Sequence, residues 1–307
     1  MGQSTDPRAS LAAYGQATAA ESYPAQYARF YATPPSASQD HVEIWYARGQ
    51  NFVVGHVDAK PGGEIQRLDQ VDEYAVLSLD TNVPFEITWG GVQTQVKGGS
   101  IAFVPAGPSS IRLQNGGRLT LMITTQNNDV CDLSVNSEAY RTQHANIPPF
   151  EKWPEPSTGP KVRHYSLDVA DEPGRFGRIW RCSTFMINVL PVQIGPRDIT
   201  KLSPHHHDTF EQGSLALEGA FTHHVRWPWN SDLNTWRADD HEFCASPSLA
   251  VIPPPAIHTS RGMNDGRNQL IDIFSPPRVD FSLKEGWVLN ADDYPLPASV
   301  KTLGGSA

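Results

Sequence analysis

The sequence is dominated by short runs of β-branched and aromatic residues, separated by turns rich in glycine, asparagine and proline. One series of such runs lies between residues 41 and 124, and a second lies between 161 and 274. Turns such as Gly90-Gly91 and Asn115-Gly116-Gly117 suit tight connections between antiparallel strands, because glycine tolerates positive φ. Many short strands at regular spacing predict an all-β sandwich or barrel.

A polar, proline-rich segment around Ile147-Pro148-Pro149 separates the two series. Such segments are typical of inter-domain linkers, so two β domains are expected. The N-terminal arm is expected to contain a short helix near Glu21 to Tyr31 and to lie over the first domain or a partner subunit. The expected boundaries are an arm at 1–40, a first domain at 41–126, a linker at 127–174, a second domain at 175–282 and a tail at 283–307.

Landmarks of the first series recur in the second. Ile44-Trp45 has a counterpart 135 residues later in Ile179-Trp180, and the run Glu73–Leu79 has one 139 residues later in Gln212–Glu218. Recurrence at a similar offset indicates two related β units in tandem.

Composition narrows the function classes. The formal net charge of −9 argues against a nucleic-acid partner, which requires clustered basic residues. No apolar run approaches the roughly 18–20 residues that span a bilayer, and Met1 to Ala20 lacks the pattern of a signal peptide. The three widely spaced cysteines, Cys131, Cys182 and Cys244, fit buried thiols in a reducing compartment. We therefore expect a cytoplasmic protein with no membrane partner.

Three consecutive histidines, His205 to His207, are the most chemically informative feature of the chain. Residues i and i+2 of a strand share a face, so His205 and His207 project together while His206 points away. His258 follows Pro253-Pro254-Pro255-Ala256-Ile257 at the end of an apolar run and would supply a third imidazole. Three imidazoles from neighbouring strands are typical of a transition-metal or zinc site.

Glu211 and Gln212 compete for a fourth ligand position, because adjacent strand residues cannot both point inward. Gln212 shares its face with the small residues Ser214 and Ala216, whereas Glu211 shares its face with leucines. The small polar face suits a cavity wall, so parity favours Gln212. Glu211 is the alternative if a β-bulge shifts the register.

These motifs resemble those of the cupins. The pattern His205-x-His207-(x)4-Gln212-(x)6-Gly219 is similar to the first cupin motif, with Gln where Glu is usual, and Pro253-x-Pro255-x-x-His258 is similar to the second. The resemblance implies two tandem cupin barrels, each a double-stranded β-helix or jelly roll.

The first half resembles a cupin that has lost its metal. Gly99-(x)5-Pro105-x-Gly107-x-x-Ser110 carries Ser110 in place of the motif's histidine, and the His-x-His positions fall on Gln66 and Leu68. The resemblance thus implies one site, in the C-terminal barrel, holding one divalent metal ion (Fe, Mn, Ni or Zn) through His205, His207, Gln212 and His258.

The expected activity is that of a metal-dependent enzyme on a small oxygenated molecule, with isomerase or lyase chemistry on a sugar acid or related carboxylate. The alternatives are an Fe(II)-dependent dioxygenase and a non-catalytic cupin that binds or senses a small ligand. His223 and His224 are candidates for acid–base catalysis, and Arg226 and Trp227 are candidates for substrate contact. The tryptophan-rich loop from Arg226 to Arg237 is equally well explained as a subunit interface, where tryptophan is common. We also expect a homodimer or a higher homo-oligomer.

Overall fold

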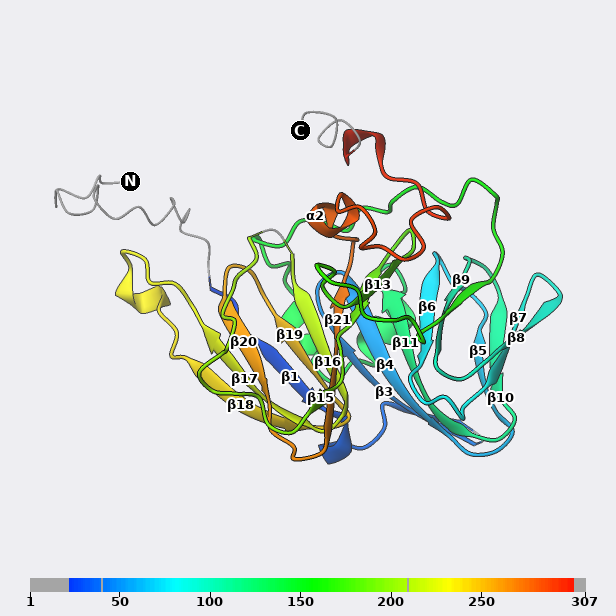
Figure 1. Ribbon diagram of the computed structural model, residues 1–307, viewed down its shortest axis with the longest axis horizontal. Helices are drawn as coiled ribbons and strands as arrows, with labels where there is room; N and C mark the ends of the chain where they lie inside the picture. The colour runs from blue at the N-terminus through cyan, green and yellow to red at the C-terminus, as the bar shows by residue number, and fades with distance from the viewer. Residues whose placement is uncertain (1–21, 40, 209, 301–307) are drawn as a thin grey trace.

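The computed structural model describes residues 22–39, 41–208 and 210–300. These residues form four antiparallel β-sheets, two in each half of the chain, so the predicted all-β class is confirmed. Two barrels lie side by side, the C-terminal one on the left of Figure 1 and the N-terminal one on the right.

The N-terminal barrel is built from a seven-stranded sheet in the order β12-β9-β6-β11-β4-β3-β2 and a four-stranded sheet in the order β5-β10-β7-β8. An apolar core of valine, isoleucine, leucine and aromatic side chains fills the space between them. The strands are β2 (Ala37–Gln39), β3 (Val42–Arg48), β4 (Phe52–Ala59), β5 (Gly63–Arg67), β6 (Tyr74–Ser78), β7 (Phe85–Trp89), β8 (Val92–Val96), β9 (Ser100–Val104), β10 (Ser109–Leu113), β11 (Gly117–Thr124) and β12 (Arg163–Ser166).

The C-terminal barrel repeats this plan with a sheet in the order β1-β19-β16-β21-β14-β13, to which β15 is attached, and a three-stranded sheet in the order β18-β17-β20. The strands are β1 (Gln26–Arg29), β13 (Arg178–Arg181), β14 (Met186–Val189), β15 (Gln193–Ile194), β16 (Gln212–Glu218), β17 (Ala220–Arg226), β18 (Asp240–Ala245), β19 (Ser248–Ile252), β20 (Ile257–Gly262) and β21 (Arg267–Phe274). The short helices are η2 (Phe30–Ala32), α1 (Asn128–Asp132), η3 (Ser137–Tyr140), η4 (Leu233–Thr235) and α2 (Val279–Ser282).

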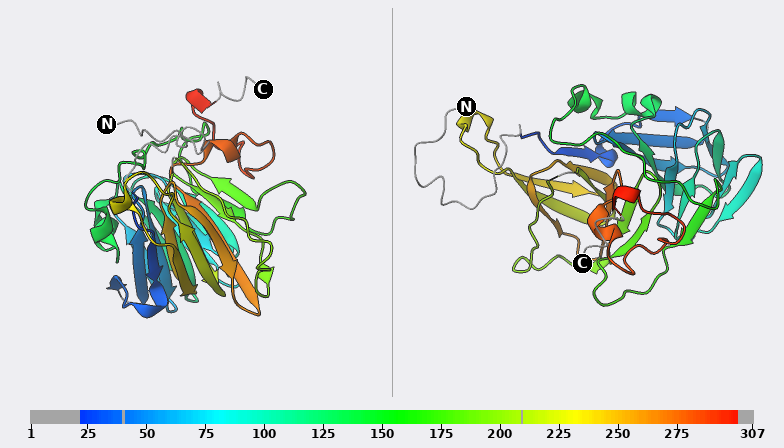
Figure 2. Two further views of the ribbon diagram at one scale, coloured as in Figure 1. Left: turned by 90° about the vertical axis from the view of Figure 1, so that its left-hand side faces the viewer. Right: turned by 90° about the horizontal axis from the view of Figure 1, so that it is seen from above.

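The two large sheets pack face to face, one from each barrel, as the turned views of Figure 2 show. Their contact is a buried apolar layer to which both halves contribute, including Phe52 and Phe103 from one barrel and Leu215 and Ile273 from the other. Burial of this layer holds the barrels together through the hydrophobic effect.

Each barrel includes one strand from the segment that precedes the other barrel in the sequence. β1 lies before the N-terminal barrel in sequence but pairs with β19, with Gln26 opposite Val251. β12 lies before the C-terminal barrel but pairs with β9, with Arg163 opposite Phe103. The helix expected near Glu21 to Tyr31 is therefore wrong: within the described residues this segment is strand β1 followed by η2, and Glu21 lies outside them. Pairing with a distant strand outweighs local helix propensity here.

Two buried carboxylates, which we call the inter-barrel clasps, link the barrels at equivalent places. Glu73, just before β6, accepts hydrogen bonds from the backbone N–H of Ser183 (2.8 Å) and from the hydroxyl of Tyr294 (2.8 Å). Glu211, just before β16, accepts them from the backbone N–H of Gln50 (2.6 Å) and from the hydroxyl of Tyr140 (2.9 Å). Each carboxylate thus binds a turn of the opposite barrel.

No helix in the described part of the chain is both long and apolar enough to cross a membrane.

Candidate metal centre

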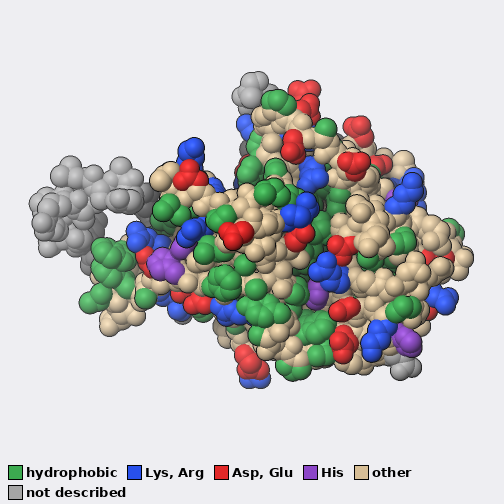
Figure 3. Space-filling model, turned by 60° about the horizontal axis from the view of Figure 1, so that its bottom comes forward, with side chains coloured by type: hydrophobic (Ala, Val, Ile, Leu, Met, Phe, Trp, Pro, Cys, Tyr) green, Lys and Arg blue, Asp and Glu red, His purple; other side chains and the backbone are tan. Residues whose placement is uncertain are grey.

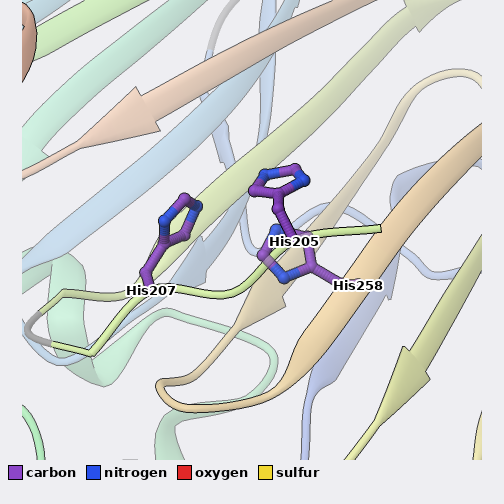
Figure 4. A group of neighbouring side chains, drawn as sticks. All are labelled: His205, His207 and His258. Carbon is purple, nitrogen blue, oxygen red and sulfur yellow. The ribbon is translucent and has the colours of Figure 1, made fainter. Parts of the chain in front are cut away.

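Three histidines meet at one end of the C-terminal barrel. His205 and His258 form an isolated antiparallel bridge, with backbone N···O distances of 3.1 and 2.8 Å. One ligand nitrogen from each of His205, His207 and His258 lies within 4.8 Å of the others. Figure 4 shows that His205 and His207 come from one loop and His258 from the neighbouring strand β20. Among the described residues this is the one group of three or more His, Cys, Asp or Glu side chains so arranged.

Backbone carbonyls set the orientation of two of the rings. Nδ1 of His205 lies 3.0 Å from the carbonyl oxygen of Ser203, and Nδ1 of His258 lies 3.0 Å from that of Ala256. A carbonyl only accepts, so each Nδ1 carries the hydrogen and each Nε2 keeps a free lone pair. Metal-binding histidines are commonly oriented in this way by a carbonyl.

Burial keeps the imidazoles of His207 and His258 neutral. It lowers the pKa of His207 to about 3 and that of His258 to about 4. Nε2 of His258 is buried and has no hydrogen-bond partner among the described residues. A neutral nitrogen without a partner in a buried site is what a metal ion requires, so the residues fit the group.

Gln212 points into the same cluster, as strand parity predicted. Its Oε1 lies 2.8 Å from Nε2 of His207. Two ligand atoms that occupy adjacent coordination positions, each about 2.1 Å from one metal ion, would lie about 3 Å apart. The spacing therefore suits both the hydrogen bond seen here and a shared ion.

Glu211 points the other way, into its inter-barrel clasp, and takes no part in the histidine cluster. Burial raises the pKa of Glu211 to about 7. The structure thus places the two competing candidates on opposite sides of the chain.

Asp272 of β21 is a site residue that was not identified from the sequence. Its Oδ1 accepts hydrogen bonds from Nε2 of Gln212 (3.1 Å) and from the hydroxyl of Ser214 (3.3 Å). Burial raises the pKa of Asp272 to about 7. A lone carboxylate within the apolar run Leu270–Phe274 was the available signal, since such a residue rarely faces a core unless it has a partner.

The two candidates for acid–base catalysis fall on opposite faces of β17. His223 faces the barrel interior, where Nδ1 lies 2.8 Å from the hydroxyl of Ser260 and Nε2 is buried without a partner among the described residues. His224 is on the outer face, with Nδ1 2.8 Å from Nδ1 of His241. Only His223 shares the interior face with His258, through the pairing of β17 with β20.

The candidates for substrate contact have partners other than the three histidines, although Val225 and Ile252 beside Trp227 pair with His258 and Gln212. Arg226 forms an ion pair with Asp239 on the surface (2.6 Å), and Trp227 is buried in a small apolar cluster with Val225 and Ile252. The exposed loop that contains η4, yellow at the left of Figure 1, carries a stacked pair of rings, Trp229 and Trp236, with centroids 4.4 Å apart.

One cation does lie near the cluster. The guanidinium of Arg278 is 4.7, 4.9 and 3.6 Å from the ring centroids of Phe210, Phe274 and Phe281, and its charge lowers the pKa values of His207 and Asp272. On the face drawn in Figure 3, by contrast, acidic and basic side chains are interspersed. That face therefore gives no indication of a ligand class.

In the N-terminal half, the positions equivalent to the histidines differ by one residue from those expected. Ser109, rather than Ser110, lies opposite Arg67 as His258 lies opposite His205, so Arg67 and Ser109 occupy the histidine positions. Gln66 and Leu68 are exposed, and Arg67 is buried in an ion pair with Asp129 (2.5 Å). Ser110 is one residue too far because the turn from Pro253 to His258 is one residue longer than that from Pro105 to Ser109. Gln66 and Leu68 are one residue off because Glu73 matches Glu211, not Gln212, as the inter-barrel clasps show.

No protein-family model and no curated protein sequence matches the chain. Solved structures do match. AerE from Microcystis aeruginosa has a TM-score of 0.53 and 12% identity, covering 79% of this chain and 96% of that one. A variant of oxalate decarboxylase from Bacillus subtilis has a TM-score of 0.54 and 13% identity, covering 81% and 76%. Oxalate decarboxylase from Lactobacillus farciminis, in a formate complex, has a TM-score of 0.52 and 15% identity, covering 77% and 81%. The chain therefore has the tandem-barrel cupin fold, with one three-histidine candidate metal site in its C-terminal barrel.

Proposed function

We propose that the C-terminal barrel binds one divalent transition-metal ion and acts on a small carboxylate-bearing molecule. His205, His207, His258 and Gln212 would hold the ion. The observation that carries the proposal is the convergence of three imidazoles on one point, two of them with Nε2 left free by backbone carbonyls.

The charge of the site supports an anionic substrate. Three imidazoles and one amide contribute no charge, so a bound divalent ion would keep its full charge toward any further ligand. Arg278 adds a cation near His207, and Asp272 is the one carboxylate of the described residues that is hydrogen-bonded to Gln212. A carboxylate or enolate oxygen is the ligand that such a site favours. The oxalate decarboxylases among the similar structures act, by name, on a substrate of this class.

A bound divalent ion supplies Lewis-acid polarisation of a carbonyl or carboxylate oxygen, which suits isomerase or lyase chemistry. The chain's own residues bind and orient the substrate. Burial lowers the pKa of His223 to about 3, so its ring is a weak base and is better suited to hydrogen-bonding a substrate hydroxyl through Nε2. Ser260 holds the ring for this contact.

The test starts with the metal content of the purified protein, which we expect to be one equivalent per chain. The protein is then loaded with Co²⁺ and titrated with oxalate, a uronate and, as a neutral control, glucose. The two carboxylates should change the visible spectrum of the ion and glucose should not. Failure to bind any metal at stoichiometry would overturn the proposal. O₂ uptake by the Fe(II)-loaded protein would replace isomerase or lyase chemistry with that of a dioxygenase, and carboxylate binding without turnover of any carboxylate would indicate a ligand-binding cupin.

A further inference from the structure

The side chain of Gln212 is held at both ends. Its Nε2 donates to the hydroxyl of Ser214 (3.0 Å) and to Oδ1 of Asp272 (3.1 Å), while its Oε1 faces Nε2 of His207 (2.8 Å). The three polar residues lie on one interior face, because Gln212 and Ser214 are two apart on β16 and Ser214 pairs directly with Asp272 on β21.

Asp272 decides which way this amide points. A cation bound at the histidines would favour the ionised form of Asp272, which only accepts hydrogen bonds. The NH₂ group of Gln212 must then face Asp272, as it does here, and the oxygen must face the histidines. The reversed amide would set two acceptors against each other at Asp272. Ser214 cannot make this choice alone, since a hydroxyl both donates and accepts.

Asp272 also lacks the ion pair that a buried carboxylate normally requires, since Arg278 acts on it without contacting it. It is 7% exposed, and no lysine, arginine or histidine of the described residues lies within ion-pair distance of it. Burial of an unpaired carboxylate is costly, and such groups are usually paired with a charge or a metal. A divalent ion held by Gln212 would be one amide away from this carboxylate.

The N-terminal barrel, which lacks the histidines, also lacks this polar set. The pairing of β6 with β9 and β11 places Tyr74, Val76 and Leu121 where the C-terminal barrel has Gln212, Ser214 and Asp272. All three belong to the apolar core of that barrel. At this interior position, a carboxylate therefore occurs in the barrel with the histidines and a leucine in the other.

We propose that Asp272 is a positioning residue of the metal centre: it fixes the oxygen of Gln212 toward the ion and supplies, from one residue further out, the negative charge that the amide lacks. The inference rests on the proposed metal site. It assigns to the pair Gln212–Asp272 the role that a single carboxylate ligand would otherwise have.

An exchange of the two side chains tests this role. Competition titration with Zn²⁺ and a chromophoric chelator gives the affinity of each variant. Asp272→Asn keeps the shape but removes the charge and should weaken binding 10- to 100-fold, as is typical for changes next to metal ligands. The double variant Gln212→Glu with Asp272→Asn reverses the same hydrogen bond and moves the charge onto the ligand. It should restore affinity to within about threefold of the wild type. Ser214→Ala, which removes the neighbouring hydroxyl only, is the matched control and should cost less than about threefold.

Wild-type affinity in Asp272→Asn would overturn the inference, as would a folded double variant that binds no better than Asp272→Asn. If the double variant does not fold, Asp272→Asn alone decides. His258→Ala separates this inference from the proposed function. Should His258→Ala bind metal normally, the site itself is wrong; should it lose the metal while Asp272→Asn does not, only the role of Asp272 is wrong.

Discussion

The two barrels share one plan of strands but differ in what fills them. Equivalent strand pairings show which interior positions of the two barrels correspond. At five of these positions, the N-terminal barrel has a core residue and the C-terminal barrel has a polar or ionisable one. The pairs, N-terminal residue first, are Tyr74 and Gln212, Val76 and Ser214, Leu121 and Asp272, Ile87 and His223, and Ile111 and Ser260.

This difference indicates that the two barrels have different roles. The N-terminal barrel encloses a continuous apolar core, which is the arrangement that stabilises a domain most. The C-terminal barrel buries several polar atoms without partners among the described residues, including the side chains of Asn188, His223, Ser248 and His258, whereas β4 and β11 of the N-terminal barrel contribute His56 and Thr120. Such atoms lower stability and collect at functional sites. On the proposed function, one copy of the fold provides the stable core and the other the metal centre.

The largest expected effect concerns the metal. His258→Ala should abolish stoichiometric binding, with a loss of at least about 100-fold in affinity, because one of three imidazoles is gone. Its counterpart Ser109→Ala should leave metal content unchanged. Inductively coupled plasma analysis of both proteins provides the measurement, and equal losses would contradict the assignment of the metal to one barrel.

Polar substitution should be tolerated in one interior and not in the other. Leu121→Asn places an amide in the apolar core and should cost about 4 kcal/mol or more, from the lost packing and the unpaired polar group. Asp272→Asn, at the matching position, keeps its hydrogen-bond acceptor and should cost less than about 1.5 kcal/mol. Urea denaturation of the metal-free proteins measures both. Similar losses would mean that the interiors do not differ in the way described.

The N-terminal half has a buried histidine of its own, His56 on β4, which lies against Phe30 and Trp45. Burial lowers the pKa of His56 to about 4 in the folded protein. Between pH 6.5 and 4 this histidine is therefore protonated in the unfolded chain but neutral in the folded one. Its contribution to stability is complete above about pH 6.5 and is lost as the pH falls toward 4, a change of about 3 kcal/mol. His56→Leu should therefore show a shallower loss of stability in acid, measured as the free energy of unfolding against pH. Parallel curves for wild type and variant would contradict this prediction.

The inter-barrel clasps should be equivalent. Tyr140→Phe and Tyr294→Phe each remove one hydrogen bond to a buried carboxylate and should each cost about 1.5 kcal/mol. Because the two sites share no partner, their effects should add in the double variant. Thermal unfolding of the three proteins tests the symmetry, and a silent change at one tyrosine would break it.

Local sequence patterns predicted much of the fold and part of the site. Strand alternation paired His205 with His207 and favoured Gln212 over Glu211, because side-chain direction repeats every two residues. That these residues meet at one point was implied by the resemblance to the cupin motifs, since His205 and His207 lie on a loop and Gln212 begins β16. Asp272 was missed because its relation to Gln212 depends on the pairing of β16 with β21, which is set by tertiary structure. The strand β1 was missed for the same reason, since its partner lies more than 200 residues away.

Anomalous diffraction from crystals grown with Co²⁺ tests the central claim most directly, because it locates the ion in both barrels at once. We predict one strong peak per chain, about 2.1 Å from an imidazole nitrogen of His205, of His207 and of His258, with Oε1 of Gln212 beside it. A peak beside Arg67 and Ser109, or no peak at the three histidines, would contradict the account.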